Sequence, residues 1–391
     1  MKSYEIFGAP LSGAAENVVF LMLDAITKLN KRIIKDPNSI NRWKRIYNKE
    51  IENIAKQFDL EWKNWANKDL AQAYIAGIKS ANNQMKKLGI DSSIKKEIAD
   101  GSFLIKRPPA ILPIPEISGQ VIAWFEGIEN QINFFNVFRA AAYYNLDKQP
   151  LQILRIADDI YRKTSIMASE SLFKEADIYT RRKFSQKMLN SFAEKGIQTI
   201  TYRNGSKWSI DNYCEMVGRT LAGRASMQAN LNRYNESGYN LVIVSSHFRA
   251  CNLCTPYENK ILSIEQTSKY ESVSDAETQG LFHPNCKHTV SAFFEGISEI
   301  TPRLATGEQE LVDRYGYDEA QKISYKAQVK QRYIERNIRN WKRKEIVSLN
   351  DNEKIRAKNK IKEWQEKQRN HLDENTFLKR KYNREQIKTA H

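Results

Sequence analysis

The cysteines and histidines of this chain gather in one short segment. Three of the four cysteines and three of the five histidines lie between positions 247 and 288 of the 391-residue sequence. Cys251 and Cys254 form a C-x-x-C knuckle, and His283 and Cys286 form an H-x-x-C knuckle after a gap of 28 residues. Thiolate and imidazole are ligands that tetrahedral Zn²⁺ prefers. The spacing therefore predicts one zinc site that is supplied by both knuckles.

The expected stoichiometry is about one zinc ion per chain, and the four expected ligands are Cys251, Cys254, His283 and Cys286. His288 is the main substitute for His283, and His247 is a more distant one. Two alternatives stay open: the paired cysteines can be a redox pair, although no βαβ pattern surrounds them, or unrelated core residues. Cys214 lies on the preceding helix and is expected to be an ordinary buried thiol.

Four protein ligands close the coordination shell of zinc, which is typical of structural rather than catalytic sites. The sequence also lacks the H-x-E motif of zinc deaminases, the H-E-x-x-H motif and a P-loop. We therefore expect no catalytic residues and no enzymatic activity. A histidine outside the zinc shell can still act as a general base, so a zinc-stabilised nuclease of the ββα-metal type is the alternative, together with a non-specific DNA-binding protein.

Short β-prone segments surround the first knuckle. Residues 239–244 form the best strand in the chain, and the β-prone run 260–264 follows the knuckle, so we expect the knuckle to sit on a hairpin. A helix at 210–235 precedes it and ends at Glu236-Ser237-Gly238. Residues 198–202 and the turn signal at 203–206 predict a further hairpin upstream.

The first half of the chain has the apolar periodicity of helices. Helices are expected at 14–34, over two apolar stripes that end at Gly89, and within 117–145 and 150–195. Four of the ten prolines lie in 106–115, which predicts a stiff connector. Four aromatic residues of the stripes can fill the protein's own core or form a docking surface, and both interpretations stay open: Tyr47, Trp62, Trp65 and Tyr74.

The positive charge of the chain is concentrated near its C-terminal end. The formal net charge is +16, and residues 321–391 hold 21 Lys and Arg against 9 Asp and Glu, a net +12. Such a helical, Lys/Arg-rich segment favours non-specific contact with double-stranded DNA, although a solvated helix face is the alternative. The candidate DNA contacts are Arg332, Arg336, Arg339, Lys342, Arg343 and Lys344.

These patterns predict an α+β protein that is predominantly α-helical, with a small α/β module supported by zinc knuckles. We expect four consecutive segments: a helical arm (1–105), a Pro-rich connector with a helical region (106–195), the zinc module (196–300) and a basic helical tail (301–391). The mean hydropathy is −0.63, and no run approaches the ~18 consecutive apolar residues of a membrane span. A soluble protein made in the cytosol, without membrane contact, is expected.

Several of these motifs together resemble phage minor capsid proteins, with the head-morphogenesis proteins of the phage Mu protein F type. The resemblance covers roughly residues 200–390, and only the helical character agrees before that. In the Mu type the last knuckle usually ends H-P-x-C-R-C, whereas His288 occupies the final position here. The segments that carry the resemblance are 206–213, 216–220, 241–247, 251–254, 280–288 and 331–339.

The resemblance implies a low-copy structural protein of a tailed phage or prophage. Such a protein lies inside the phage head near the portal vertex and is present in the host cytoplasm during assembly. Its implied partners are the portal protein, the scaffold or major capsid protein, and packaged DNA. On this interpretation the N-terminal helices dock to the portal or the inner capsid wall.

Overall fold

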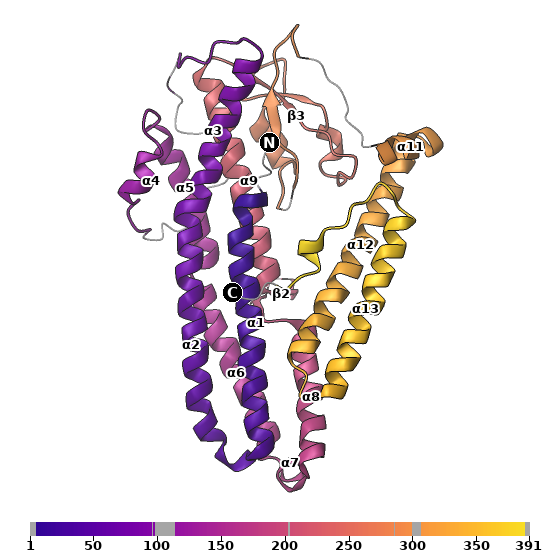
Figure 1. The fold of residues 1–391 in the computed structure, drawn as a ribbon. Coiled ribbons are helices and arrows are strands. Elements are labelled where there is room, and N and C mark those ends of the chain that lie inside the picture. Colours follow the sequence, from indigo (N-terminus) through magenta and orange to yellow (C-terminus); the bar gives the residue numbers. More distant parts are fainter. Residues whose placement is uncertain are drawn as a thin grey trace. The chain divides into compact units, whose positions relative to one another are not determined.

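The computed structural model describes residues 5–95, 97, 114–201, 204–284, 286–298 and 306–387. The described chain is predominantly helical and contains two small antiparallel sheets, so the predicted helix-rich α+β class is confirmed (Figure 1). Residues 106–113 of the predicted Pro-rich connector lie outside the described residues.

The predicted helices and strands are present, and the structure adds a helix at Val273–Thr278 and a strand at Val290–Ala292. The helices are α1 (Glu5–Lys35), α2 (Ile40–Asn64), α3 (Leu70–Lys87), α4 (Gly119–Ala123), α5 (Gln131–Leu146), α6 (Gln149–Ser169), α7 (Ser171–Glu175), α8 (Ile178–Lys195), α9 (Ile210–Glu236), α10 (Val273–Thr278), α11 (Thr306–Tyr315), α12 (Tyr317–Ile346) and α13 (Asp351–Asp373). The strands are β1 (Gln198–Thr201), β2 (Lys207–Ser209), β3 (Leu241–Val244), β4 (Ile261–Ser263) and β5 (Val290–Ala292).

The chain forms two compact units, and each is assembled from three separated segments. The first unit comprises Met1–Leu11, Trp62–Leu146 and Glu215–Lys322. The second unit comprises Ser12–Glu61, Asp147–Cys214 and Ile323–His391. The compact units therefore interleave along the chain, whereas the sequence patterns divide it into four consecutive segments.

In the first unit, α3 and α9 pack against the sheet that leads into the knuckles. Met85 of α3 and Leu231 and Tyr234 of α9 belong to one buried apolar cluster with Val242 of β3. The two helices approach closely at Gly77, where an added Cβ would lie 2.1 Å from the carbonyl oxygen of Ser226. The sheet consequently rests on a rigid helical support.

The four aromatic rings for which the sequence allowed either a core role or a docking role are buried. Trp62, Trp65 and Tyr74 in the first unit and Tyr47 in the second unit are each at most 1% exposed. Trp62 meets the ring of Tyr143 edge-on at 4.9 Å. The interpretation as core residues is confirmed, and a docking surface made of these four rings is wrong, because burial leaves no ring face for a partner.

The three-stranded sheet has the order β4-β3-β5, and β3 is antiparallel to both neighbours. Alternate β3 residues, Val242 and Val244, face the core and are at most 1% exposed. The predicted hairpin of β3 and β4 is confirmed. Because β3 runs antiparallel to both neighbours, the end of β3 and the beginnings of β4 and β5 meet at one edge of the sheet.

In the second unit, α1, α2, α6 and α8 supply the buried helical surfaces. Tyr47 of α2 donates a hydrogen bond to the carbonyl of Ala157 on α6 at 3.2 Å. Arg181 of α8 donates one to the carbonyl of Ile34 on α1 at 3.1 Å. Upstream of α9, β1 and β2 pair antiparallel, which confirms the predicted hairpin.

Helix α1 is unusually apolar. Its segment Ile6–Lys35 is the one helix, within the described ranges, that is long and apolar enough to cross a membrane by length and composition. Half of its most apolar window is buried inside the protein. Leu23, Ile26 and Leu29 are completely buried, which is the pattern of a core helix.

Candidate metal centre

The knuckles lie at the sheet edge where β3 ends and β4 and β5 begin. Cys251 and Cys254 lie in the connection between β3 and β4, and His283, Cys286 and His288 directly precede β5. The sheet therefore brings together two segments that are about 30 residues apart in the sequence. A metal ion at this position would cross-link the two segments beside the apolar cluster that underlies the sheet.

The sulfur and nitrogen atoms of the knuckles converge to metal-binding distances. Cys251 Sγ lies 3.0 Å from His283 Nε2, and Cys254 Sγ lies 3.5 Å from Cys286 Sγ. Two groups of possible ligand atoms share Cys254, and within each group all atoms lie within 4.8 Å of one another. Tetrahedral zinc with Zn–S bonds of about 2.3 Å holds two sulfurs about 3.8 Å apart. The spacing of the Cys254 and Cys286 thiols thus fits zinc without a large rearrangement.

His288 is oriented by a buried carboxylate. Its Nδ1 lies 3.4 Å from Cys286 Sγ, and its Nε2 lies 3.3 Å from Glu258 Oε1. The side chains of His288 and Glu258 are only 3% and 6% exposed, and Glu258 also accepts a hydrogen bond from the backbone N–H of His247. A metal-ligating histidine commonly donates its second ring N–H to a carboxylate, which fixes the ring. His288 has this arrangement.

His283 is arranged differently. Its Nε2 faces Cys251, and its Nδ1 lies 2.8 Å from the carbonyl oxygen of Pro284, which also fixes the ring. It is more exposed than His288. The protein therefore offers five donor atoms, one more than tetrahedral zinc needs.

His247, the more distant substitute, belongs to neither group of donor atoms among the described residues. Its Nε2 lies 2.8 Å from the carbonyl oxygen of Lys287, and its ring meets that of His288 edge-on at 4.8 Å. Burial lowers the pKa of His247, and the neighbouring His288 lowers it further. His247 is thus a neutral packing partner beside the centre.

The electrostatics of the centre favour a thiolate at Cys286. The hydrogen bond with the Cys254 thiol makes the largest contribution and, with the help of His288, lowers the pKa of Cys286 to about 4. Burial lowers the pKa of His288, but hydrogen bonds with Cys286 and Glu258 outweigh it and raise that pKa to about 9. Thiolate is the form in which cysteine binds metals. By contrast, Cys214 is completely buried and burial raises the pKa of its thiol, so the predicted ordinary buried thiol is confirmed.

Two further residues hold the centre, and the sequence analysis missed both. Arg224 of α9 donates hydrogen bonds to the carbonyl of Phe282 and forms an ion pair with Glu277 of α10 at 3.1 Å. Phe282 has a positive φ of 58°, an uncommon backbone conformation directly before the second knuckle. Glu258 is the other missed residue, and nothing in its spacing distinguishes it from the other acidic residues of the sequence.

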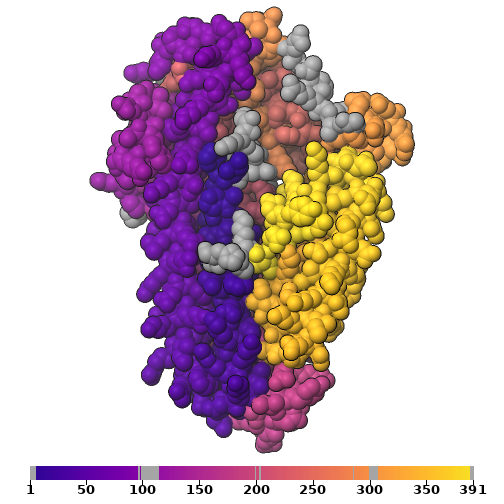
Figure 2. Space-filling model, viewed as in Figure 1, coloured from indigo at the N-terminus to yellow at the C-terminus, as the bar shows by residue number. Residues whose placement is uncertain are grey.

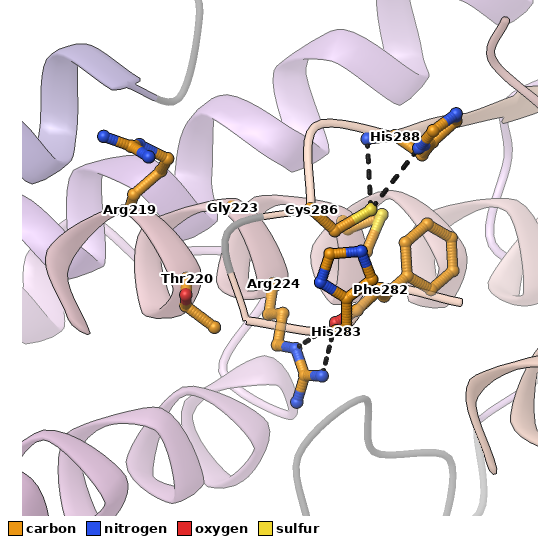
Figure 3. A pocket seen from close by; sticks show the side chains of 9 residues that line it. Arg219, Thr220, Gly223, Arg224, Phe282, His283, Cys286 and His288 are labelled. Atoms are coloured by element: carbon orange, nitrogen blue, oxygen red, sulfur yellow. Dashed lines mark hydrogen bonds between the residues drawn. The ribbon is translucent and has the colours of Figure 1, made fainter. Parts of the chain in front are cut away.

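A small pocket separates the second knuckle from α9 (Figure 3). Its volume is about 20 Å³, which is room for about one water molecule. Arg219 and Thr220, which belong to the motifs of the resemblance, line it together with His283, Cys286 and His288. The motif on α9 and the second knuckle are therefore neighbours in space. The pocket is too small for an organic substrate.

The candidate DNA contacts of the tail do not share one surface. Arg336 is exposed and Arg332 is half-buried. Arg343, in contrast, is only 8% exposed and forms an ion pair with the buried Asp211. Its assignment as a DNA contact is wrong, because its guanidinium is enclosed by the protein and neutralised there.

Three other candidates make contacts within the second unit, and Arg339 and Lys342 make theirs inside the tail itself. Arg339 donates a hydrogen bond to the carbonyl of Arg384, and Lys342 donates one to Gln386 at 2.9 Å. Lys344 lies 3.4 Å from the carboxylate of Glu194 on α8. All three are half-buried, so part of the positive charge of the tail serves internal contacts.

Comparison with known proteins points to phage structural proteins. Residues 137–373 match the family described as phage minor capsid protein 2. A structural protein of Lactococcus phage LL-H is 24% identical over 323 residues, which cover 78% of this chain and 80% of the relative. A structural protein of Lactococcus phage mv4 is 31% identical over 125 residues, 30% of this chain and 93% of the relative. No solved structure matches. The similarity begins well before residue 200, further upstream than the motifs alone indicate.

Proposed function

The chain belongs to the phage minor capsid protein 2 family, and on this premise we propose that it is a low-copy head protein held together by one structural zinc ion. Its membership confirms the resemblance to phage minor capsid proteins, and its relatives are structural proteins of phages. The single observation that carries the zinc proposal is the convergence of donor atoms from two knuckles at one sheet edge.

The proposed ligands are Cys254, Cys286 and His288, which form one group of donor atoms, and Cys251, which would join them from the neighbouring group through the shared Cys254. The spacing of the sequence favoured His283 as a ligand. His288 is preferred here because it is buried and a carboxylate orients it. His283 is the alternative fourth ligand. Three thiolates and one imidazole form a closed shell, so the ion would hold the knuckles and would leave no position for a substrate.

The proposed place of the protein is the interior of the phage head near the portal vertex, with the portal protein and the scaffold or major capsid protein as partners. Support comes from the family membership and from the structural proteins among the relatives. The helices before residue 88 contribute to the cores of both units. The portal contact therefore belongs to surfaces of the folded protein and not to the four buried aromatic rings.

Double-stranded DNA is the third proposed partner, bound by the positive tail without sequence preference. The net +12 of residues 321–391 supports this contact. Nuclease activity finds no support in the two histidines outside the proposed shell, since His247 is turned toward the carbonyl of Lys287 and both ring nitrogens of His283 face Cys251 and the carbonyl of Pro284. The proposal is therefore a structural role without catalysis.

Elemental analysis of the full-length protein, purified without added metal, tests the zinc proposal. About one zinc per chain is expected, and removal of zinc by a chelator should lower the unfolding temperature. Metal-free protein with unchanged folding would contradict the proposal. A supercoiled-plasmid assay with divalent metal should detect no nicking, and nicking that is lost in a His247→Ala variant would establish the nuclease instead.

Co-expression with the portal protein of the same phage tests the proposed location. The full-length chain should co-purify with the portal, and the zinc-free protein should do so less well if the knuckles lie near the contact. Failure of full-length, zinc-loaded protein to bind the portal would contradict the proposed position in the head. It would leave the zinc proposal unaffected.

A further inference from the structure

One face of α12 exposes aromatic and basic side chains together. Tyr325, Val329 and Tyr333 recur every four residues and are 43%, 43% and 53% exposed. Because residues four apart share one face of a helix, these three form a stripe. Lys326, Lys330 and Arg336 are exposed around the same stripe. We call the six residues the outer face of α12: Tyr325, Lys326, Val329, Lys330, Tyr333 and Arg336.

The opposite side of the same helix is buried. Ala327, Ile334 and Ile338 are at most 8% exposed. Helix α13 packs beside α12 in the second unit, where the imidazole of His371 lies 2.9 Å from the carbonyl oxygen of Ala327 (Figure 1). The core of the second unit therefore accounts for one side of α12, and the outer-face residues Tyr325 and Val329 lie outside that core.

No acidic residue neutralises this face along the helix. The sequence contains no Asp or Glu between Glu319 and Glu335. Glu335 is itself only 2% exposed and lies 3.9 Å from Arg384, so its charge is turned inward. In the part of the tail that the structure describes, residues 306–387, the ion pairs do not include any of the three outer-face cations.

The neighbouring helix extends the same kind of surface. Trp364 of α13 meets the ring of Tyr333 edge-on at 5.7 Å, and Lys367 lies over the Trp364 ring at 4.3 Å. Residues after 350, yellow in Figure 2, are at the surface of the molecule in that view. Rings and cations therefore lie together on two adjacent helices, but Lys367 is paired with Glu363 at 2.9 Å, so the unpaired cations of this surface are those of α12.

Exposed rings beside unpaired cations are typical of surfaces that bind single-stranded nucleic acid. Lysine and arginine attract phosphates and release the counterions of a nucleic acid. Aromatic rings can stack on bases only where the bases are unpaired, because a duplex hides the base faces. The two tyrosines are eight residues apart, about 12 Å along the helix axis. This distance separates two stacking positions on one strand.

We propose that the outer face of α12 binds single-stranded nucleic acid more tightly than duplex, with Lys326, Lys330 and Arg336 on the phosphates and Tyr325 and Tyr333 on the bases. This inference rests on the proposed DNA contact of the tail and assigns it to a surface and a substrate class. The inner cations hold the tail in place, and the outer cations bind the nucleic acid.

Binding of zinc-loaded, full-length protein to mixed-sequence single-stranded and duplex DNA tests the proposal by fluorescence anisotropy across a salt series. The wild type should prefer the single strand. A triple Lys326→Glu, Lys330→Glu and Arg336→Glu variant should bind at least tenfold more weakly, and its salt slope for single strands should fall by about 2, as expected for three lost phosphate contacts. Its unfolding temperature should not change, because all three side chains are exposed.

The matched control carries the same charge change on α13: Lys354→Glu, Lys358→Glu and Lys362→Glu, at three exposed lysines spaced four residues apart. This control should lose clearly less affinity than the α12 variant. Equal losses in the two triple variants would overturn the assignment to the outer face while leaving non-specific DNA binding by the tail intact. Absence of DNA binding by the wild type would overturn both proposals.

The rings are tested separately from the charges. Tyr325→Ala and Tyr333→Ala should each weaken single-strand binding about tenfold and leave duplex binding unchanged, whereas Tyr→Phe at either position should retain binding because the ring remains. Equal affinity of the wild type for single strands and duplex would overturn the substrate class. Competition by polyglutamate as effective as that by single-stranded DNA would also overturn it, and would identify an acidic protein segment as the partner.

Discussion

In the knuckle module (residues 241–292) the donor side chains gather in two overlapping groups that share Cys254, whereas in the tail (residues 323–387) the charged side chains divide between two faces of a helix. Three thiols and two imidazoles of the module meet at one sheet edge. In the tail, Arg343 is enclosed with Asp211 while Lys330 is exposed. Basic residues of one helix therefore have two roles: Arg343 stabilises the fold, whereas Lys330 forms part of an external surface.

The difference has an energetic consequence. A closed metal centre depends on every ligand at once, because each missing ligand removes much of the binding free energy. The tail distributes its contacts over many hydrogen bonds and ion pairs, so a single loss should be partial. Substitutions in the two regions should accordingly differ in size and in cooperativity.

The largest effect is expected from Cys254→Ser, since Cys254 belongs to both groups of donor atoms. Structural zinc contributes about 10–16 kcal/mol in small zinc domains, more than the module can lose and remain folded. Zinc content should fall to near zero, and amide hydrogen exchange should show loss of protection in β3, β4 and β5. Cys214→Ala is the control and should keep its zinc. If the Cys254 variant retained its zinc, the metal centre would not depend on every ligand.

A smaller but still large effect is expected from Asp211→Ala in the second unit. Asp211 is 6% exposed and its partner Arg343 is 8% exposed, so the substitution leaves a buried guanidinium without its ion pair. Removal of one partner from a buried pair costs about 3–5 kcal/mol. Chemical denaturation should show this loss while zinc content stays unchanged. A loss below about 1 kcal/mol would mean that other contacts carry the attachment of the tail.

The same pair predicts a dependence on pH. Burial raises the pKa of Asp211, but Arg343, Ser209 and Arg339 outweigh it and the net shift is downward. A carboxylate with a depressed pKa in the folded state stabilises the protein above its ordinary pKa of about 4, and this stabilisation disappears as the pH falls toward the folded-state value. An Asp211→Asn variant should therefore lose less stability than the wild type between neutral pH and about pH 3.

A moderate effect is expected from Glu258→Gln, which removes the charge that orients His288. Loss of such an outer-sphere partner lowers metal affinity about 10–100-fold. Competition with a chromophoric chelator measures this change, and His288→Ala should weaken binding further. If His283→Ala weakens zinc binding more than His288→Ala, then His283 is the fourth ligand and the assignment from the carboxylate is wrong.

The smallest effect is expected from Lys344→Met. Its partner Glu194 is 63% exposed, and ion pairs of this kind contribute about 0–1 kcal/mol. Thermal unfolding should change little, because the substitution removes only this ion pair and the contact of the Lys344 ammonium with the Trp341 ring, which contributes about 0.5–1 kcal/mol. A loss as large as that of Asp211→Ala would remove the proposed distinction between buried and peripheral contacts in the tail.

Local patterns predicted the elements well. The hairpins, the long helix before β3 and the helices of the tail depend on periodicity and turn residues within short windows, and all are present in the structure. The knuckle residues were predictable for a similar reason, since cysteine and histidine are rare and their spacing is distinctive. In these cases the physical cause lies within a few residues of its effect.

Sequence alone determined the residue types that can bind zinc, the helix-rich class and the positive charge of the tail. Tertiary structure decided that Trp62 and Tyr74 are core residues, that Arg343 is neutralised by Asp211, and that Glu258 orients His288. Each of these depends on a partner that is distant in the sequence. The apolar stripe of a helix does not indicate which element will pack against it. Burial and pairing are properties of packing between distant segments, so only the folded chain assigns the inner and outer roles of its charges.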